Sequence, residues 1–401
     1  MTHLRVRLMI RFVEVSSTIS RVRRGMSETN AENSADPFQE HSGVLVNPIV
    51  GVLRQFAALL PFVGVYCLAV GYPGFRWEVQ LFWTLWTAYF LFCWTSLFHE
   101  TVHLTLPRPA WYNVTLGRII GTLLLVPYHV YRESHIRHHA YLNRPNDWEL
   151  WPYSDPNRSV WFRRVFAWVD LCFGFLTAPY VYGRTYFHPN SPIKQFEVLR
   201  AIRREYLAMG LFWGSMAILI VMTGTGMMFI RAWVIPHMLA GIFQVGRKFT
   251  EHLGMASFDP LLGTRTVMGR NFITRFASFL NFEIFVHGPH HRYPRVSHQN
   301  LKGKMHEHLQ REPMLQIPCY SSYLSAVAAM LPSLLVNPGV GMNAGAAALN
   351  RVDVADVSEF LVDSCSISDG NDPSGSAPGR HPPAESSTPS VRELSAKDTP
   401  I

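Results

Sequence analysis

The sequence is short of charged side chains and of cysteine. Charged residues make up 16% of its 401 residues, against roughly 25% in soluble domains, so the composition argues against an ordinary soluble protein. The five cysteines are an odd number and include no Cys-x-x-Cys spacing, so neither a disulfide framework nor a thiolate metal site is indicated. We interpret the cysteines as small apolar side chains.

Hydrophobic residues are abundant instead. They make up 48% of the chain and gather in long runs, which is typical of a protein that crosses a membrane several times. The net charge of +8 would also suit a nucleic-acid-binding protein, but the arginines are scattered between apolar runs. We therefore attribute the charge to the excess of Lys and Arg in cytoplasmic loops, and we expect no nucleic-acid partner.

Four apolar runs are long enough to cross a bilayer core of about 30 Å. They are residues 51–71, 80–98, 207–223 and 227–243. Three other apolar segments are short or are interrupted by Asp170, Pro179 or Pro332, namely residues 115–128, 166–182 and 321–336. We expect re-entrant or interfacial positions for these three segments.

The distribution of arginines predicts which side of the membrane is cytoplasmic. The loop between residues 108 and 204 holds many arginines, whereas the short loops on the opposite face have few, Arg76 and Arg231 being the nearest. Because Lys and Arg are enriched in cytoplasmic loops, we expect the long loop and both termini on the cytoplasmic side.

The two ends of the chain differ from its middle. The first 25 residues carry six arginines and one acid, which fits an organelle-targeting segment or upstream sequence ahead of a start at Met26, and we favour the second. After residue 336 the chain is rich in Gly, Ala, Ser and Pro and buries too little apolar surface to offset the entropy of ordering. We expect disorder at 1–44 and 337–401 around one catalytic domain at 45–336.

Three histidine clusters lie at the edges of the apolar runs. They are HETVH at 99–103, HIRHH at 135–139 and HGPHH at 287–291. Histidines spaced by three or four residues share one face of a helix, and imidazole binds Zn, Cu, Fe and Ni. Because a zinc site takes about four ligands, these eight histidines are too many for one zinc and enough for two metals.

The clusters leave several kinds of metal protein open. Two irons that share imidazoles can activate dioxygen and attack an unactivated C–H bond, and substrates with such bonds dissolve in the membrane. The first cluster also fits H-E-x-x-H, the zinc-protease motif in which Glu100 would be the general base, but a protease leaves the other two clusters without a role. A non-catalytic metal-binding membrane protein is the third alternative.

The three clusters, in this order and position relative to the apolar runs, resemble the histidine boxes of the membrane fatty acid desaturase family. Alkane hydroxylases and carotenoid hydroxylases and ketolases belong to the same superfamily. The resemblance covers roughly residues 45–309. It implies an all-α, polytopic membrane fold of about four transmembrane helices with interfacial helices and a cytoplasmic, histidine-lined di-iron cap.

The resemblance also implies the residues of the site. RKFTEHLG at 247–254 lies where the family commonly supplies a further ligand. The expected iron ligands are His99, His103, His135, His138, His139, His252, His287, His290 and His291. Candidates to hydrogen-bond and orient these ligands are Glu100, Asp147, Glu251 and His298, with Asn143 and Glu149. His237 lies in the last apolar run, where a polar group is a functional hypothesis by default, but it is outside the clusters.

The implied function is that of an oxygen-dependent, di-iron acyl-lipid desaturase, which introduces a double bond into a lipid acyl chain with two Fe ions as cofactor and O2 as co-substrate. A di-iron hydroxylase or ketolase of an alkane or carotenoid is the nearest alternative, and the zinc intramembrane protease a more distant one. No His-Pro-Gly-Gly haem motif occurs, so we expect electrons from a separate donor of the ferredoxin or cytochrome b5 type.

Overall fold

The computed structural model describes residues 48–71 and 74–345. This part of the chain is almost entirely helical, and its strands are one short parallel pair, β1 (Thr266–Val267) and β2 (Cys319–Tyr320). The all-α fold expected from the sequence is confirmed. The segments for which we predicted disorder lie largely outside the described residues, and that prediction stays a prediction.

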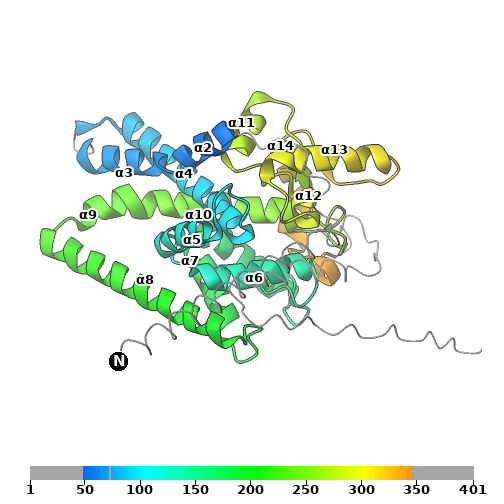
Figure 1. Cartoon of the computed structure of the whole chain (residues 1–401), viewed down its shortest axis with the longest axis horizontal. Coiled ribbons are helices and arrows are strands. Elements are labelled where there is room, and N and C mark those ends of the chain that lie inside the picture. Colours follow the sequence, from blue (N-terminus) through cyan, green and yellow to red (C-terminus); the bar gives the residue numbers. More distant parts are fainter. Residues whose placement is uncertain (1–47, 72–73, 346–401) are drawn as a thin grey trace, which may run out of the picture. The chain divides into compact units, whose positions relative to one another are not determined.

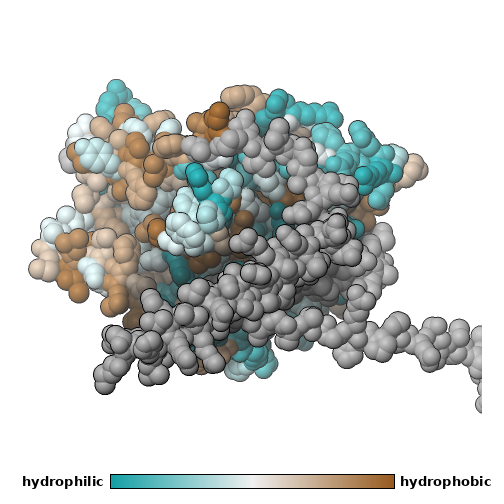
Figure 2. Space-filling model, viewed as in Figure 1, coloured by the Kyte–Doolittle hydropathy of each residue, from teal (hydrophilic) through white to brown (hydrophobic). Residues whose placement is uncertain are grey.

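Within the described ranges, five helical segments are long and apolar enough to cross a membrane, so the protein is a multi-pass membrane protein. They are Ile49–Gly71, which comprises α2 (Pro48–Ala57) and α3 (Leu60–Gly71); α4 (Trp77–His103); α7 (Val160–Phe187); α8 (Phe196–Thr223); and Gly226–His252, which comprises α9 (Gly226–Phe229), η3 (Ile230–Val234) and α10 (Ile235–His252). Four of the five contain the runs predicted to cross. Hydrophobic side chains gather around α3 and α9 on the face in Figure 2, and hydrophilic ones gather over α13 (Leu301–Arg311).

The fifth candidate, α7, exceeds the sequence-based expectation of about four spans. Asp170 and Pro179 within it argued for a re-entrant or interfacial segment, and the structure gives the carboxylate of Asp170 partners inside the protein. Lys248 Nζ donates to Asp170 at 2.6 Å and the Tyr153 hydroxyl donates to it at 3.1 Å. Because its charge is paired, Asp170 does not prevent an apolar helix of 28 residues.

The helix α7 is nevertheless bent. Phe173 in its middle has non-helical torsion angles, φ −126° and ψ 34°. Phe166 before the bend and Tyr180 after it contact the same ring, with centroids 5.4 Å and 5.9 Å from that of Trp151. In a straight helix these two residues would lie roughly 21 Å apart along the axis, too far to share one indole. The two arms of α7 therefore fold back toward each other.

The segment predicted to be re-entrant forms a sharp bend. Helices α5 (Ala110–Leu123) and α6 (Tyr128–Ala140) meet at 104°, and Leu125 between them has a positive φ of 61°. Gly117 makes room for the bend, because a Cβ there would lie 2.4 Å from the Tyr128 ring. The Tyr128 hydroxyl donates to the carbonyl of Thr101 at 3.1 Å. The bend therefore holds the start of α6 against the end of α4.

The remaining described elements follow α10 in the chain. They are α11 (Phe272–Leu280), α12 (His287–Arg292), η4 (His298–Asn300), α13, α14 (Tyr323–Val336) and η5 (Gly341–Asn343). The helix α14 is the short apolar helix expected at 321–336. The described chain continues beyond it, and Asn343 Nδ2 donates to the carbonyls of Tyr153 at 3.1 Å and Asp155 at 3.0 Å.

The helix α10 runs through the middle of the assembly of helices (Figure 1) and packs against both α4 and α7. Leu91 and Phe98 of α4 form a core with Tyr131 of α6 and Ala240 of α10. The ends of α4 and α10 therefore meet near α6. Arg265, which is fully buried, fixes the end of α10 by donating to the carbonyl of Leu253 at 2.7 Å.

Candidate metal centre

Nine buried histidines converge from four helices. His99 and His103 lie in the last turns of α4, and His252 ends α10. The others belong to α6 (His135, His138, His139) and α12 (His287, His290, His291). The expected ligand set and the set that the fold brings together are therefore the same nine residues.

The nine side chains form two groups. The first group is His99, His103, His135, His139 and His290, and the second group is His138, His252, His287 and His291. Within each group, the possible ligand nitrogens all lie within 4.8 Å of one another. The groups adjoin because α6 and α12 each contribute to both, and the rings of His139 and His291 stack with centroids 4.2 Å apart.

The helical spacing explains how one helix serves both groups. In α6, His135 and His139 are one turn apart and enter the first group, while His138 points to the second. In α12 the assignment is reversed, because His287 and His291 enter the second group and His290 the first. The H-x-x-H-H spacing thus places a ligand pair at one group and a single ligand at the other.

The nitrogen spacing fits a bound cation in each group. In the first group, Nε2 of His135 lies 3.1 Å from that of His103 and 3.0 Å from that of His139. In the second group, Nε2 of His287 lies 2.8 Å from that of His252 and 3.1 Å from that of His291. Metal–imidazole bonds are about 2.0–2.1 Å long, so two ligands at right angles place their nitrogens about 3 Å apart. Each group can hold a metal ion.

Burial also keeps the imidazoles of α12 in the neutral form that can bind a metal. Burial, reinforced by the neighbouring histidines, lowers the pKa of His287, His290 and His291 well below the ordinary histidine value. Metal binding requires the neutral ring. An all-imidazole donor set suits Zn, Cu, Fe or Ni, whereas Mg and Ca prefer oxygen ligands.

Two carboxylates contact the outer nitrogens of the histidines in α6. His138 Nδ1 lies 2.8 Å from Asp147 Oδ2, and His135 Nδ1 lies 2.9 Å from Glu149 Oε2. Burial opposes the charge on Glu149, yet the facing His135, together with His138 and the Tyr182 hydroxyl, lowers its pKa to about 2. A charged Glu149 accepts the His135 N–H and leaves Nε2 for the metal, which is a common arrangement behind metal-binding histidines.

The other expected orienting residues are placed less directly. Glu100 Oε2 lies 3.0 Å from His298 Nδ1, and its Oε1 lies 3.4 Å from His99 Nδ1. Glu251 Oε2 is 3.7 Å from His287 Nε2, beyond hydrogen-bond distance. Asn143 donates to the carbonyls of residues 257 and 263, both at 2.8 Å, and supports that loop instead of a histidine.

Sequence reasoning missed two neighbours of the histidines. The Tyr131 ring stacks on His135 with centroids 5.3 Å apart, and its position one turn before His135 was the only signal in the sequence. The Tyr182 hydroxyl donates to Glu149 Oε1 at 3.0 Å, a contact that depends on how α7 bends. His237 lies outside both groups, roughly 22 Å of helix before His252.

The comparisons with known proteins agree with this geometry. The sequence profile of the family described as Fatty acid desaturase matches residues 51–323. An omega-3 fatty acid desaturase, chloroplastic, of Brassica napus is 25% identical over 252 residues, which cover 55% of this chain and 59% of that protein. An sn-1 acyl-lipid omega-3 desaturase (ferredoxin) of Synechocystis sp. is 24% identical over 270 residues, which cover 63% of this chain and 70% of that protein.

A third relative, the sn-2 acyl-lipid omega-3 desaturase (ferredoxin), chloroplastic, of Arabidopsis thaliana, is 25% identical over 252 residues, 55% of this chain and 54% of that protein. The chain thus spans between 54% and 70% of the lengths of these relatives. The profile, however, matches well over half of the chain and includes all nine histidines. The chain belongs to the fatty acid desaturase family.

Proposed function

We propose that the protein is an oxygen-dependent, di-iron desaturase that introduces a double bond into a lipid acyl chain. One observation carries the proposal: nine buried histidines gather in two adjoining groups where apolar helices end. A site in this position can act on a chain that is dissolved in the membrane. Membership of the desaturase family supports the same reaction.

The first group would hold one iron through five histidines and the second group another through four. When bound, the two irons supply the activation of O2 that removal of hydrogen from an unactivated C–H bond requires. The protein's own contribution is to hold the nine nitrogens in place. Asp147 and Glu149 keep the Nδ1 protons of His138 and His135 on the outer side of each ring, so that Nε2 stays available.

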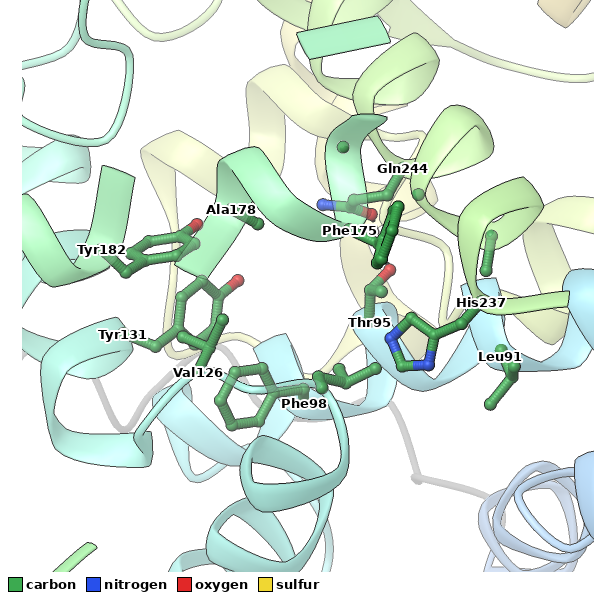
Figure 3. A pocket seen from close by; sticks show the side chains of 14 residues that line it. Leu91, Thr95, Phe98, Val126, Tyr131, Phe175, Ala178, Tyr182, His237 and Gln244 are labelled. Carbon is green, nitrogen blue, oxygen red and sulfur yellow. Dashed lines mark hydrogen bonds between the residues drawn. The ribbon is translucent and has the colours of Figure 1, made fainter. Parts of the chain in front are cut away.

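The acyl chain would approach through an apolar cavity beside the first group. This cavity has a volume of about 70 Å³ and lies between α4, α6, α7 and α10. Phe98, next to His99 in the sequence, and Tyr131, which stacks on His135, are part of its wall (Figure 3). These rings exclude water and hold an apolar chain close to the first group.

Electrons would come from a separate donor, of the ferredoxin or cytochrome b5 type. Two relatives carry ferredoxin in their names, which supports the first type. We also propose that the histidine groups and both termini lie on the cytoplasmic side, as the arginine distribution predicts.

The alternative reactions receive less support. The nine histidines would serve a hydroxylase or ketolase of an alkane or carotenoid as well as a desaturase, but the three relatives are named as desaturases, and analysis of the product distinguishes the reactions. A zinc protease would need Glu100 as a base beside the metal. Glu100 instead contacts His298 at 3.0 Å and accepts a hydrogen bond from Thr105 Oγ1 at 2.6 Å.

The proposal is tested by metal and product analysis of the purified, detergent-solubilised protein. We expect about two irons per chain, a sharp fall in His287→Ala, and no change in His306→Ala, since His306 is an exposed histidine of α13. A saturated acyl lipid, O2 and reduced ferredoxin should then give an unsaturated product. One zinc per chain that persists in His287→Ala would refute the di-iron proposal, and an oxygenated product would replace desaturation by hydroxylation.

A further inference from the structure

The wall of the cavity beside the first group is mostly apolar, but it includes a buried polar side chain. This side chain is His237, which is 8% exposed. Its Nδ1 is buried and has no hydrogen-bond partner. The nearest described rings are apolar faces, with centroids at 5.4 Å for Trp233 and 6.5 Å for Phe175. A buried, unpaired imidazole is unfavourable, and in a membrane-embedded helix it marks a functional site by default.

A second polar group faces the same cavity. Thr95 Oγ1 lies 2.6 Å from Gln244 Oε1 and 2.7 Å from the carbonyl of Phe92. A hydroxyl has one hydrogen, so Thr95 donates to one of these two groups only. Whichever group accepts the Thr95 hydrogen, only one of the two polar atoms of the Gln244 amide contacts Thr95. The other amide atom faces the cavity (Figure 3). Gln244 lies seven residues, or about two turns, after His237 on α10, so both residues share one face.

We propose that this cavity binds an oxygen atom, hydroxyl or carbonyl, carried on the apolar chain of the substrate. The inference rests on the proposed function, because it names the substrate class of the same site. The His237 ring supplies a donor or an acceptor to that oxygen, and the amide of Gln244 supplies the other contact. A plain hydrocarbon in the same position leaves Nδ1 of His237 without a partner and offers nothing to the atom of the Gln244 amide that does not contact Thr95.

The position of His237 separates this contact from the second histidine group. His237 precedes His252 by 15 residues, roughly 22 Å of helix. The His237 contact would therefore lie well before the second group along α10, whereas Thr95, the partner of Gln244, lies one turn before His99 of the first group. The bound oxygen would set which chain is accepted, and with it the position of the chain relative to the histidine groups.

Direct binding to the purified, detergent-solubilised protein tests the inference without turnover. The probes are octadecanoic acid and a series of its monohydroxy and monoketo isomers, each competing with radiolabelled octadecanoic acid. We expect at least one oxygenated isomer to bind about tenfold more tightly than octadecanoic acid, as one added hydrogen bond allows. His237→Phe keeps a ring and removes both nitrogens, so it should lose this preference and still bind octadecanoic acid.

His306→Phe, an exposed histidine changed in the same way, is the matched control and should keep the preference. Gln244→Leu is a second variant that should reduce it. The inference fails if no isomer is preferred by the unchanged protein, or if His237→Phe keeps the preference, because the cavity then holds water or a plain chain. Failure of the desaturase proposal is read separately, from iron content and product, since the binding ratio depends on neither.

Discussion

At the scale of single residues, the histidines of the site differ in whether Nδ1, the outer ring nitrogen, has a hydrogen-bond partner. Asp147 and Glu149 face His138 and His135 directly, whereas Nδ1 of His139, His252 and His291 is buried without a hydrogen-bond partner. Carboxylates behind metal-binding histidines fix the ring and make it a better ligand. The two histidines of α6 with such partners are therefore the best oriented, and one belongs to each group.

This difference gives a prediction for Asp147→Asn. The change removes the negative charge that accepts the His138 N–H, and we expect it to weaken iron binding by about 10- to 100-fold. Iron retained during dialysis against a graded series of chelator concentrations measures the change. Glu307→Gln, at a half-exposed carboxylate of α13 that pairs with Lys304, is the control. Equal retention in Asp147→Asn and the unchanged protein would contradict the orienting role.

At the scale of elements, the site depends on the close approach of α7 and α10. Gly174 and Gly241 let the two backbones touch, since a Cβ on Gly174 would lie 2.7 Å from the carbonyl oxygen of Gly241. Both glycines line the cavity beside the first group. The bend at Phe173 begins next to this contact and brings Tyr182 to Glu149. The packing of two helices thus decides which side chain supports His135.

Two alanine substitutions in α10 test this packing. A methyl group on Gly241 would lie 2.6 Å from the backbone nitrogen of Phe175, so Gly241→Ala should destabilise the protein by about 1–3 kcal/mol through overpacking. Gly246 has nothing within 4 Å of the added methyl, so Gly246→Ala should stabilise α10 by about 0.5–1 kcal/mol. Thermal unfolding in detergent measures both. A higher melting temperature for Gly241→Ala would mean that the helices do not pack as described.

At the scale of the whole molecule, the meeting of the histidines restricts the topology. The histidines of α6 and His252 at the end of α10 lie in one site, so an even number of crossings separates them. Three candidate spans, α7, α8 and Gly226–His252, lie between them. By length and composition alone, all three segments would be counted as membrane crossings. Because both arms of α7 contact Trp151, we infer that α7 enters the membrane and returns, while α8 and Gly226–His252 cross it.

Labelling of single cysteines checks this topology in sealed membranes, after the five native cysteines are replaced. Asn190→Cys lies in the exposed link between α7 and α8, and Gln310→Cys lies in α13, the helix that packs against α12. Both should react with a membrane-impermeant maleimide from the same side. Thr223→Cys, at the last residue of α8 beside the turn to α9, should react from the opposite side. If position 190 reacts together with position 223, α7 crosses the membrane completely.

The sequence by itself determined which histidines can bind metal and which segments are apolar enough to enter a membrane. Histidine spacing of three and four residues fixes which rings share a helix face, and long apolar runs fix which segments enter a membrane, because both depend on neighbours along the chain. The spacing could not assign each histidine to a group, and the apolar run of α7 could not reveal its bend. Residues distant in sequence decide three further features. These are the ion pair of Asp170, the contact between Gly174 and Gly241, and the position of His237 in the wall of the cavity. Only the tertiary structure decided these, because it alone determines which polar groups are paired and which face an empty space.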